Sequence, residues 1–147
     1  MHPLRFLIRL GILILLTVSA ATSWAQRAQV KNEVTQCAVE MADLIHQDLG
    51  VRLAKIDQDV LAQTGAYVNY QVPVQEKSLY VFIACGERSL EDLDVKIYNS
   101  QGNLVLKDQK PGNRSVVQIA PKSSEIYIIK VLASKGKGAF AFASLVR

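Results

Sequence analysis

The sequence has 147 residues, of which 50% are hydrophobic and 20% are charged, with 17 basic and 13 acidic side chains. This length allows one compact domain with its own hydrophobic core. The net charge of +4 falls to +2, from 15 basic and 13 acidic residues, without Arg5 and Arg9 near the N-terminus. A charge this small does not indicate a nucleic acid or an anionic membrane surface as the partner. We therefore expect neither, and the order of residues along the chain is more informative than the charge.

Residues 1–25 have the pattern of an export signal. A basic start is followed by the apolar stretch Leu10–Val18 and by small residues up to Ala25. This order is typical of a cleaved secretory signal, and the apolar part is shorter than the roughly 20 residues that a membrane span needs. We expect a mature chain that begins near Gln26, is periplasmic or secreted, and has no stable insertion in the membrane.

Both cysteines, Cys37 and Cys85, lie in the expected mature chain. Cysteines of an exported protein usually pair, so we expect a disulfide between these two. It would close a loop of about 50 residues and stabilise the fold by about 4 kcal/mol. Two buried thiols are the alternative. A metal site is not expected here, since only His46 could add a nitrogen ligand to this widely spaced pair.

Residues 26–64 are expected to form a helical segment. Apolar side chains recur every three or four positions from Val30 to Ile45, which is the spacing of one helix face. A second apolar run, 51–61, is expected to continue the helix after Gly50, which could be a C-cap, a kink or the start of a turn. The helix is expected to pack on its own domain, and a coiled-coil partner is the alternative.

Residues 65–147 are expected to form an antiparallel β-sandwich domain. Turn residues separate seven short segments with strand character, namely 67–74, 79–85, 93–98, 104–106, 116–119, 125–132 and 139–146. Regular short strands are typical of a sandwich, and the lack of strand–helix alternation argues against a nucleotide-binding sheet. Pro73 favours an edge position for the first strand, whereas 79–85 is apolar on both faces and should be central.

The strand segments resemble the bacterial pre-peptidase C-terminal domain over about 67–147. The resemblance is carried by Leu79–Cys85, by Asp92–Tyr98 with its Asp-Leu-Asp start, by the turn around Gln101-Gly102-Asn103, and by Tyr127–Val131. It implies a mainly-β, jelly-roll-like sandwich, preceded in this chain by the helical segment. It also implies an exported, non-catalytic domain, some of whose relatives bind calcium or polymeric substrates.

The acidic residues Glu91, Asp92 and Asp94 are the best candidate metal ligands, and the metal would be calcium. Calcium takes six to eight oxygen ligands, and Asp92 and Asp94 would share one face of a strand. Asn99 and Asn103 could lie nearby. The alternative is a solvated acidic loop whose aspartates accept hydrogen bonds from turn amides. No other cofactor is expected.

The expected mature chain offers little for catalysis. It contains one histidine, His46, on the expected helix, and has no nucleophile elbow, phosphate-binding loop or paired-histidine motif. We therefore expect a protein that is not an enzyme. Tyr67 and Tyr98 stand at the ends of expected strands, and we expect these two rings to contact a partner.

The sequence thus predicts an exported, non-catalytic binding or accessory module. Its expected partner is another envelope or secreted protein or a surface polymer. Two alternatives stay open. One is an envelope protein that interacts or dimerises through its helix, and the other is a calcium-stabilised module that binds cell-surface polymers.

Overall fold

The computed structural model describes residues 26, 28–108 and 110–147, so the expected export signal at 1–25 lies outside the described residues. The chain divides into two compact units, Met1–Val30 and Lys31–Arg147. The second unit contains the helix from residue 31 onward and all the described strands. Among the described helical residues, no segment is long and apolar enough to cross a membrane.

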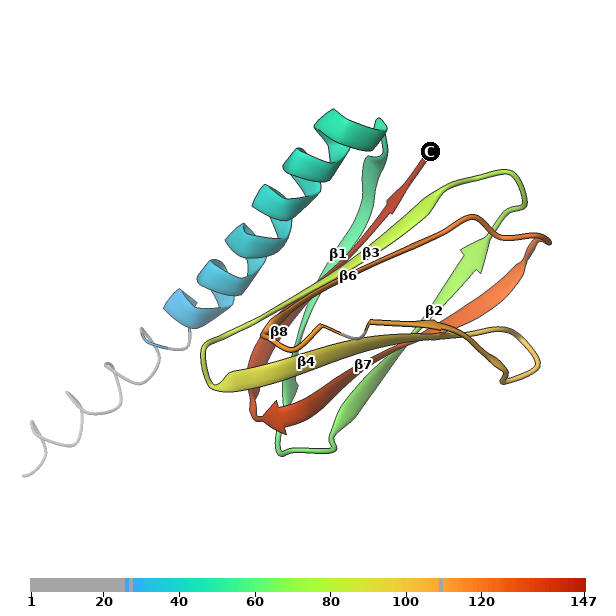
Figure 1. The fold of residues 1–147 in the computed structure, drawn as a ribbon. Helices are drawn as coiled ribbons and strands as arrows, with labels where there is room; N and C mark the ends of the chain where they lie inside the picture. The colour runs from blue at the N-terminus through green and yellow to red at the C-terminus, as the bar shows by residue number, and fades with distance from the viewer. Residues whose placement is uncertain (1–25, 27, 109) are drawn as a thin grey trace, which may run out of the picture. The chain divides into compact units, whose positions relative to one another are not determined.

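Eight strands in the described part of the chain form two four-stranded antiparallel sheets (Figure 1). Sheet A has the order β1-β8-β3-β6, and sheet B has the order β2-β7-β4-β5. The strands are β1 Arg52–Leu61, β2 Tyr67–Val74, β3 Tyr80–Gly86, β4 Leu90–Tyr98, β5 Leu104–Lys107, β6 Arg114–Ile119, β7 Glu125–Gly136 and β8 Gly138–Val146. The predicted mainly-β sandwich is confirmed, and each of the seven expected strands overlaps an observed one.

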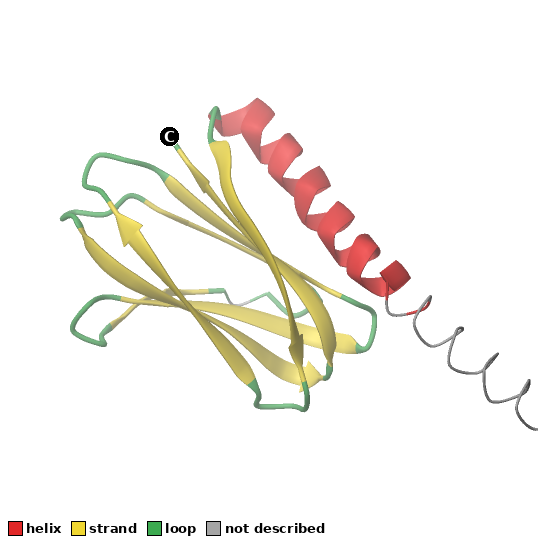
Figure 2. Cartoon of the chain, turned by 180° about the vertical axis from the view of Figure 1, so that it is seen from behind, coloured by secondary structure: helices red, strands yellow, loops and turns green. Residues whose placement is uncertain are grey.

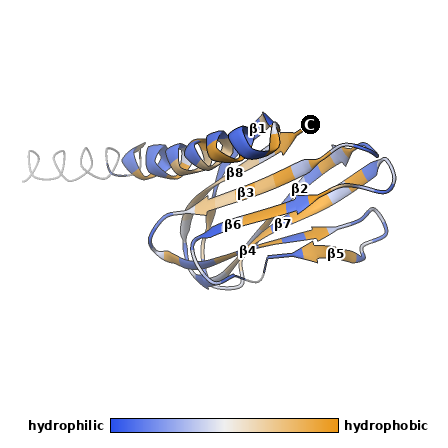
Figure 3. Cartoon of the chain, turned by 45° about the horizontal axis from the view of Figure 1, so that its top comes forward, coloured by the Kyte–Doolittle hydropathy of each residue, from blue (hydrophilic) through white to orange (hydrophobic). Residues whose placement is uncertain are grey.

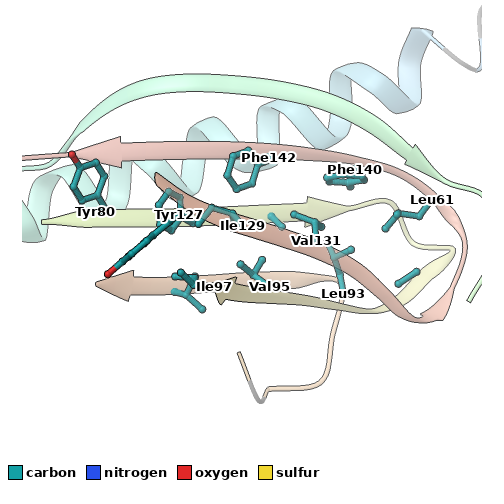
Figure 4. Close-up of a cluster of buried hydrophobic side chains, with 14 of the residues drawn as sticks. Leu61, Tyr80, Leu93, Val95, Ile97, Tyr127, Ile129, Val131, Phe140 and Phe142 are labelled. Atoms are coloured by element: carbon teal, nitrogen blue, oxygen red, sulfur yellow. The ribbon is translucent and has the colours of Figure 1, made fainter. Parts of the chain in front are cut away.

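The main core lies between the two sheets, where alternate residues of each strand point inward. In β7, for example, Tyr127, Ile129 and Val131 are buried while the residues between them face outward. Figure 4 shows these side chains opposite Phe140 and Phe142 of β8. The period-two pattern of the sequence therefore determines which face of each strand enters the core.

The helix, described over 28–49, ends at Gly50. Gly50 adopts a φ of +66° and donates its N–H to the His46 carbonyl at 2.8 Å. A glycine in this left-handed conformation is a common helix C-cap. Arg147 Nη1 adds a hydrogen bond of 2.7 Å to the Leu49 carbonyl. These contacts satisfy carbonyl groups that the last helical turn leaves without partners.

From residue 31 onward the helix lies over the outer face of sheet A (Figure 2). A second core forms there from Val34, Ala38 and Ala42 of the helix and Val51, Val81, Ile83, Cys85, Ala141, Ala143 and Leu145. The central strand β3 therefore buries one face against sheet B and the other against the helix, which explains its continuous apolar run (Figure 3). The expected packing of the helix on its own domain is confirmed.

The disulfide predicted between Cys37 and Cys85 is present. It joins the helix to β3 across a sequence separation of 48, with the two Cα atoms 6.1 Å apart. The Met41 sulfur lies 3.2 Å from the Cys85 sulfur and packs beside the bond. Covalent and apolar contacts together hold the helix against sheet A.

The expected continuation of the helix after Gly50 is wrong, because Arg52–Leu61 forms β1, an edge strand of sheet A. Ile56 and Val60 are four positions apart, and this spacing fits one helix face as well as one strand face. Ile56 and Leu61 decide between them, because positions five apart in a strand lie on opposite faces. Leu61 points into the core between the sheets, whereas Ile56 packs on the helix side.

Candidate functional site

The outer face of sheet B is uncovered in the described structure, whereas the helix covers the outer face of sheet A. We call this surface the open face. It consists of the outward side chains of three strands, namely Tyr67, Asn69 and Gln71 of β2, Ile126, Ile128, Lys130 and Leu132 of β7, and Asp92, Asp94, Lys96 and Tyr98 of β4. All of these side chains are exposed or half-buried. The open face is the sheet surface on which a ligand could lie.

A cluster of two tyrosines and a lysine occupies the middle of the open face. Lys130 Nζ lies 4.2 Å from the centre of the Tyr67 ring and 5.4 Å from the centre of the Tyr98 ring. The strand register explains this contact. Lys130 pairs with Asn69 on one side and with Lys96 on the other, so both tyrosines are its diagonal neighbours. We call these three residues the tyrosine–lysine cluster.

The tyrosine–lysine cluster holds two aromatic rings in a defined position while leaving them accessible. Each cation–π contact at an exposed site is worth about 0.5–1 kcal/mol, which is enough to restrict a surface side chain. Tyr67 remains 55% exposed, and Tyr98 is half-buried. The two tyrosines that the sequence analysis selected therefore lie on one surface, although their role as partner contacts stays a prediction.

The sequence analysis did not select Lys130 as a partner contact. It follows two isoleucines in the stretch Tyr127-Ile128-Ile129-Lys130-Val131. In a strand, its alternation with buried Ile129 and Val131 places it on the outer face. That alternation was the available signal, but the partners of Lys130 depend on the sheet order, in which β7 lies between β2 and β4.

The aspartates predicted as metal ligands also lie on the open face, next to a charged hollow. Asp92 and Asp94 point the same way from β4, as expected from their spacing. The hollow, of about 370 Å³, is lined by Asp92, Asp94, Asp108, Lys96, Lys107, Lys110 and Pro111. Three carboxylates are thus balanced by three ammonium groups, and the hollow carries no net charge.

Each of the three predicted ligands has a partner within the protein. Asp92 Oδ1 accepts a hydrogen bond from the Gly112 N–H at 2.9 Å, and Asp94 Oδ2 accepts one from the Ser134 hydroxyl at 2.5 Å. Glu91 pairs with Lys135 at 2.5 Å, and this contact raises the pKa of the Lys135 ammonium. Among the described residues, no three His, Cys, Asp or Glu side chains are placed to hold a metal ion.

Hydrogen bonds that involve side chains stabilise the turn between β4 and β5. Asn99 Oδ1 accepts hydrogen bonds from the backbone N–H groups of Gln101 and Asn103, at 3.1 and 2.8 Å. Ser100 donates its N–H and its hydroxyl to Glu125, at 3.0 and 2.7 Å, which lowers the pKa of the Glu125 carboxyl. The turn is therefore fixed to the start of β7, and the Asn99 side chain stabilises the turn itself.

His46 is part of the helix end. Its Nδ1 donates a hydrogen bond of 2.7 Å to the Val51 carbonyl, directly after the Gly50 cap. The helix that carries it covers sheet A, whereas the tyrosine–lysine cluster lies on sheet B. The structure thus gives His46 a local structural contact and does not bring it to the open face.

No protein-family model matches the sequence, and no curated protein matches it at a significant level. Solved structures do match. The pre-peptidase C-terminal domain of a collagenase from Bacillus anthracis has a TM-score of 0.50 and 16% identity, covering 63% of this chain and 89% of that one. The chain has the fold of a pre-peptidase C-terminal domain. The resemblance predicted from the strand motifs is thereby confirmed for the fold.

Other solved β-sandwiches are similar at lower scores. PliG of Aeromonas hydrophila, a periplasmic inhibitor of g-type lysozyme, has a TM-score of 0.48 and 14% identity, with 67% of this chain and 89% of that one covered. A xylan-binding module from Roseburia intestinalis has a TM-score of 0.41 and 9% identity, with 65% and 86% covered. At such identities the similarity concerns the fold, so function must be argued from the open face.

Proposed function

We propose that this chain is an exported, non-catalytic binding module that holds a glycan chain of the cell surface on its open face. The observation that carries the proposal is the tyrosine–lysine cluster, in which Lys130 lies between Tyr67 and Tyr98 on the uncovered outer face of sheet B. Two aromatic rings with a lysine between them present stacking surfaces together with N–H donors. A sugar chain offers the matching apolar ring faces and hydroxyl groups.

The rest of the open face supports a polymer rather than a small molecule. The sheet surface is extended, and the outward side chains of β4 lead from Tyr98 in the cluster to Asp94 and Asp92 at the charged hollow. Carboxylate and ammonium groups there would exchange hydrogen bonds with sugar hydroxyls. An extended chain could contact both places at once, and each added contact would increase its affinity.

Export is supported by two features of the chain. Residues 1–25 have the basic, apolar and small-residue order of a secretory signal. The Cys37–Cys85 disulfide is of the kind that persists in oxidising compartments and is rare in the cytosol. Both features agree with a partner outside the cytoplasm, where surface glycans are found.

Affinity electrophoresis in gels that contain a panel of soluble polysaccharides, together with sedimentation with peptidoglycan sacculi, tests the proposal. The wild-type protein is expected to be retarded by at least one glycan. Tyr67→Ala and Tyr98→Ala should each weaken binding about tenfold, as expected for loss of a stacking contact of about 1.4 kcal/mol. Tyr67→Phe keeps the ring and should retain most of the affinity.

Leu44→Ala provides a matched control, because Leu44 is a 62% exposed side chain on the helix side of the molecule. It should bind as the wild type does. Lack of binding to every glycan, or equal binding by Tyr67→Ala and the wild type, would overturn the proposal. Loss of binding in Leu44→Ala would move the site to the helix.

A further inference from the structure

The described sandwich has a cleft on one side, between the edge strands of its two sheets. β1 pairs only with β8, and β2 pairs only with β7, so these two edges face each other without hydrogen bonds between them. A hollow of about 500 Å³ lies there, and its lining includes Lys55, Asp57, Tyr70 and Phe142. This volume is within the range of pockets that hold small ligands or single side chains.

The cleft has an aromatic wall. The Tyr70 ring is stacked on Phe142, with ring centres 4.1 Å apart and planes 9° apart. The ring centre of Phe142 lies 6.1 Å from that of Phe82. Tyr80 also lines the hollow. Because these rings belong to the main core, the wall is rigid and could receive an aliphatic or planar group.

One polar group in the cleft has no partner. The Tyr70 hydroxyl oxygen is buried, and no described residue forms a hydrogen bond with it. Leaving a buried hydroxyl unpaired costs about 1–3 kcal/mol, so a ligand that supplies the missing partner would recover part of this cost. Burial, Asp59 and Asp57, in that order, raise the pKa of the Tyr70 phenol, so it stays a neutral hydroxyl, which can both donate and accept a hydrogen bond.

The charges around the cleft favour a cation. Asp57 and Asp59 are two positions apart on β1 and thus share the strand face that points toward Tyr70. Lys55 Nζ pairs with Asp57 at 2.7 Å, and Asp59 accepts a hydrogen bond from the Val60 N–H. Asp57 lines the hollow and Asp59 lies near it, so two carboxylates stand against one ammonium there. The Lys55 side chain is 63% exposed, and such surface ion pairs are weak enough for a ligand to displace.

We propose that this cleft binds an arginine side chain of an extended peptide segment in a partner protein. The aliphatic stem would lie against the aromatic wall, and the guanidinium would donate hydrogen bonds to Asp57 and to the Tyr70 oxygen. Arginine suits the site better than lysine, because its planar head stacks on aromatic rings, has five donors and is weakly hydrated. The arginine is expected to belong to an extended peptide because β1 and β2, beside the cleft, are edge strands. The outward backbone groups of an edge strand can pair with an extended chain.

Titration of the ¹⁵N-labelled protein with the peptide Ac-Gly-Val-Arg-Val-Gly-NH₂, followed by NMR, tests this site. Amide shifts are expected in β1 and β2. The same peptide with citrulline in place of arginine has the same shape without the charge, and it should bind at least about tenfold more weakly, as for loss of a buried charged pair. N-acetyl-arginine amide should bind more weakly than the pentapeptide, because it cannot pair with a strand edge.

Two variants in the cleft and one control variant on the helix locate the binding site. Asp57→Asn should weaken binding of the arginine peptide about tenfold, whereas Asp48→Asn, on the exposed side of the helix, should leave it unchanged. Tyr70→Phe should weaken binding and also raise the melting temperature of the free protein, since it removes the unpaired hydroxyl. Equal binding of the citrulline peptide, unchanged binding by Asp57→Asn, or shifts confined to the open face would overturn the proposal. Shifts confined to the open face would overturn the cleft proposal alone, and the proposed glycan-binding function would still stand.

Discussion

Cys37 of the helix is bonded to Cys85 of β3, the strand whose two faces are both buried. The bond therefore fixes the helix to the centre of sheet A. This arrangement gives the two sheets different surfaces. The outer face of sheet A is closed by the helix, and that of sheet B is left open for the tyrosine–lysine cluster.

Removing the disulfide should lower stability and loosen the helix. The double variant Cys37→Ala/Cys85→Ala is expected to lose about 4 kcal/mol in the free energy of unfolding, as the chain-entropy model gives for a loop of this size. Urea unfolding of the variant and the wild type measures this difference. Amide hydrogen exchange should accelerate most in the helix. Identical unfolding midpoints would show that apolar packing alone holds the helix.

Gly136→Ala should be among the most destabilising substitutions in the hairpin between β7 and β8. Gly136 has a φ of +90°, and a Cβ added there would overlap with the Ser89 carbonyl oxygen and lie 2.9 Å from the Glu91 nitrogen. We expect a loss of more than about 3 kcal/mol, since backbone atoms must shift. Gly65→Ala is the matched control. Its φ is +86° with nothing within 4 Å, so it should lose only about 1–2 kcal/mol. Equal losses in thermal unfolding would contradict the overlap.

Glu125 should make stability depend on pH in the acid range. The hydrogen bonds from Ser100 lower the folded-state pKa of its carboxyl. Such a group stabilises the fold above its unfolded pKa, and this contribution is lost as the pH falls through the folded pKa. Glu125→Gln should therefore melt at a lower temperature than the wild type at neutral pH, with the difference vanishing once the pH falls below the folded-state pKa of Glu125. Asp43→Asn, at an exposed helix position, should show no such pattern. A difference that persists in acid would contradict this role of Glu125.

Calcium should leave the melting temperature unchanged. The carboxylates of Asp92 and Asp94 accept hydrogen bonds from Gly112 and Ser134, and Glu91 pairs with Lys135. A calcium ion would have to replace these contacts beside three lysines of the charged hollow. Differential scanning fluorimetry with calcium and with a chelator measures the effect. A rise in melting temperature with calcium would favour the calcium-stabilised alternative.

Much of the fold follows from local patterns in the sequence. The alternation in Tyr67–Val74 predicts β2 with the observed bounds, and Pro73 correctly predicts its edge position. The apolar run Leu79–Cys85 predicts the central strand β3. The error at 52–61 arose where four-residue spacing fits both a helix and a strand. At that edge, Asp57 and Asp59 occupy the strand face of buried Leu61, where apolar residues would be expected, so the usual apolar alternation is weak.

The candidate site could be predicted only in part. Tyr67, Tyr98, Asp92 and Asp94 were selected from the sequence, and the structure places all four on the open face. Their connection through Lys130 depends on β7 lying between β2 and β4. Sheet order results from long-range pairing, which residue patterns within single strands do not contain. The unpaired Tyr70 hydroxyl likewise depends on the contact between strands of different sheets.

The most direct test of the open face as the binding surface is an NMR titration of the ¹⁵N-labelled protein with an oligosaccharide of a glycan that retards it in affinity electrophoresis. The account predicts that the largest amide shifts occur in β2, β7 and β4 around Tyr67, Lys130 and Tyr98, and that Tyr67→Ala needs about tenfold more oligosaccharide to reach them. Shifts confined to the helix and sheet A, with those three strands unchanged, would contradict it.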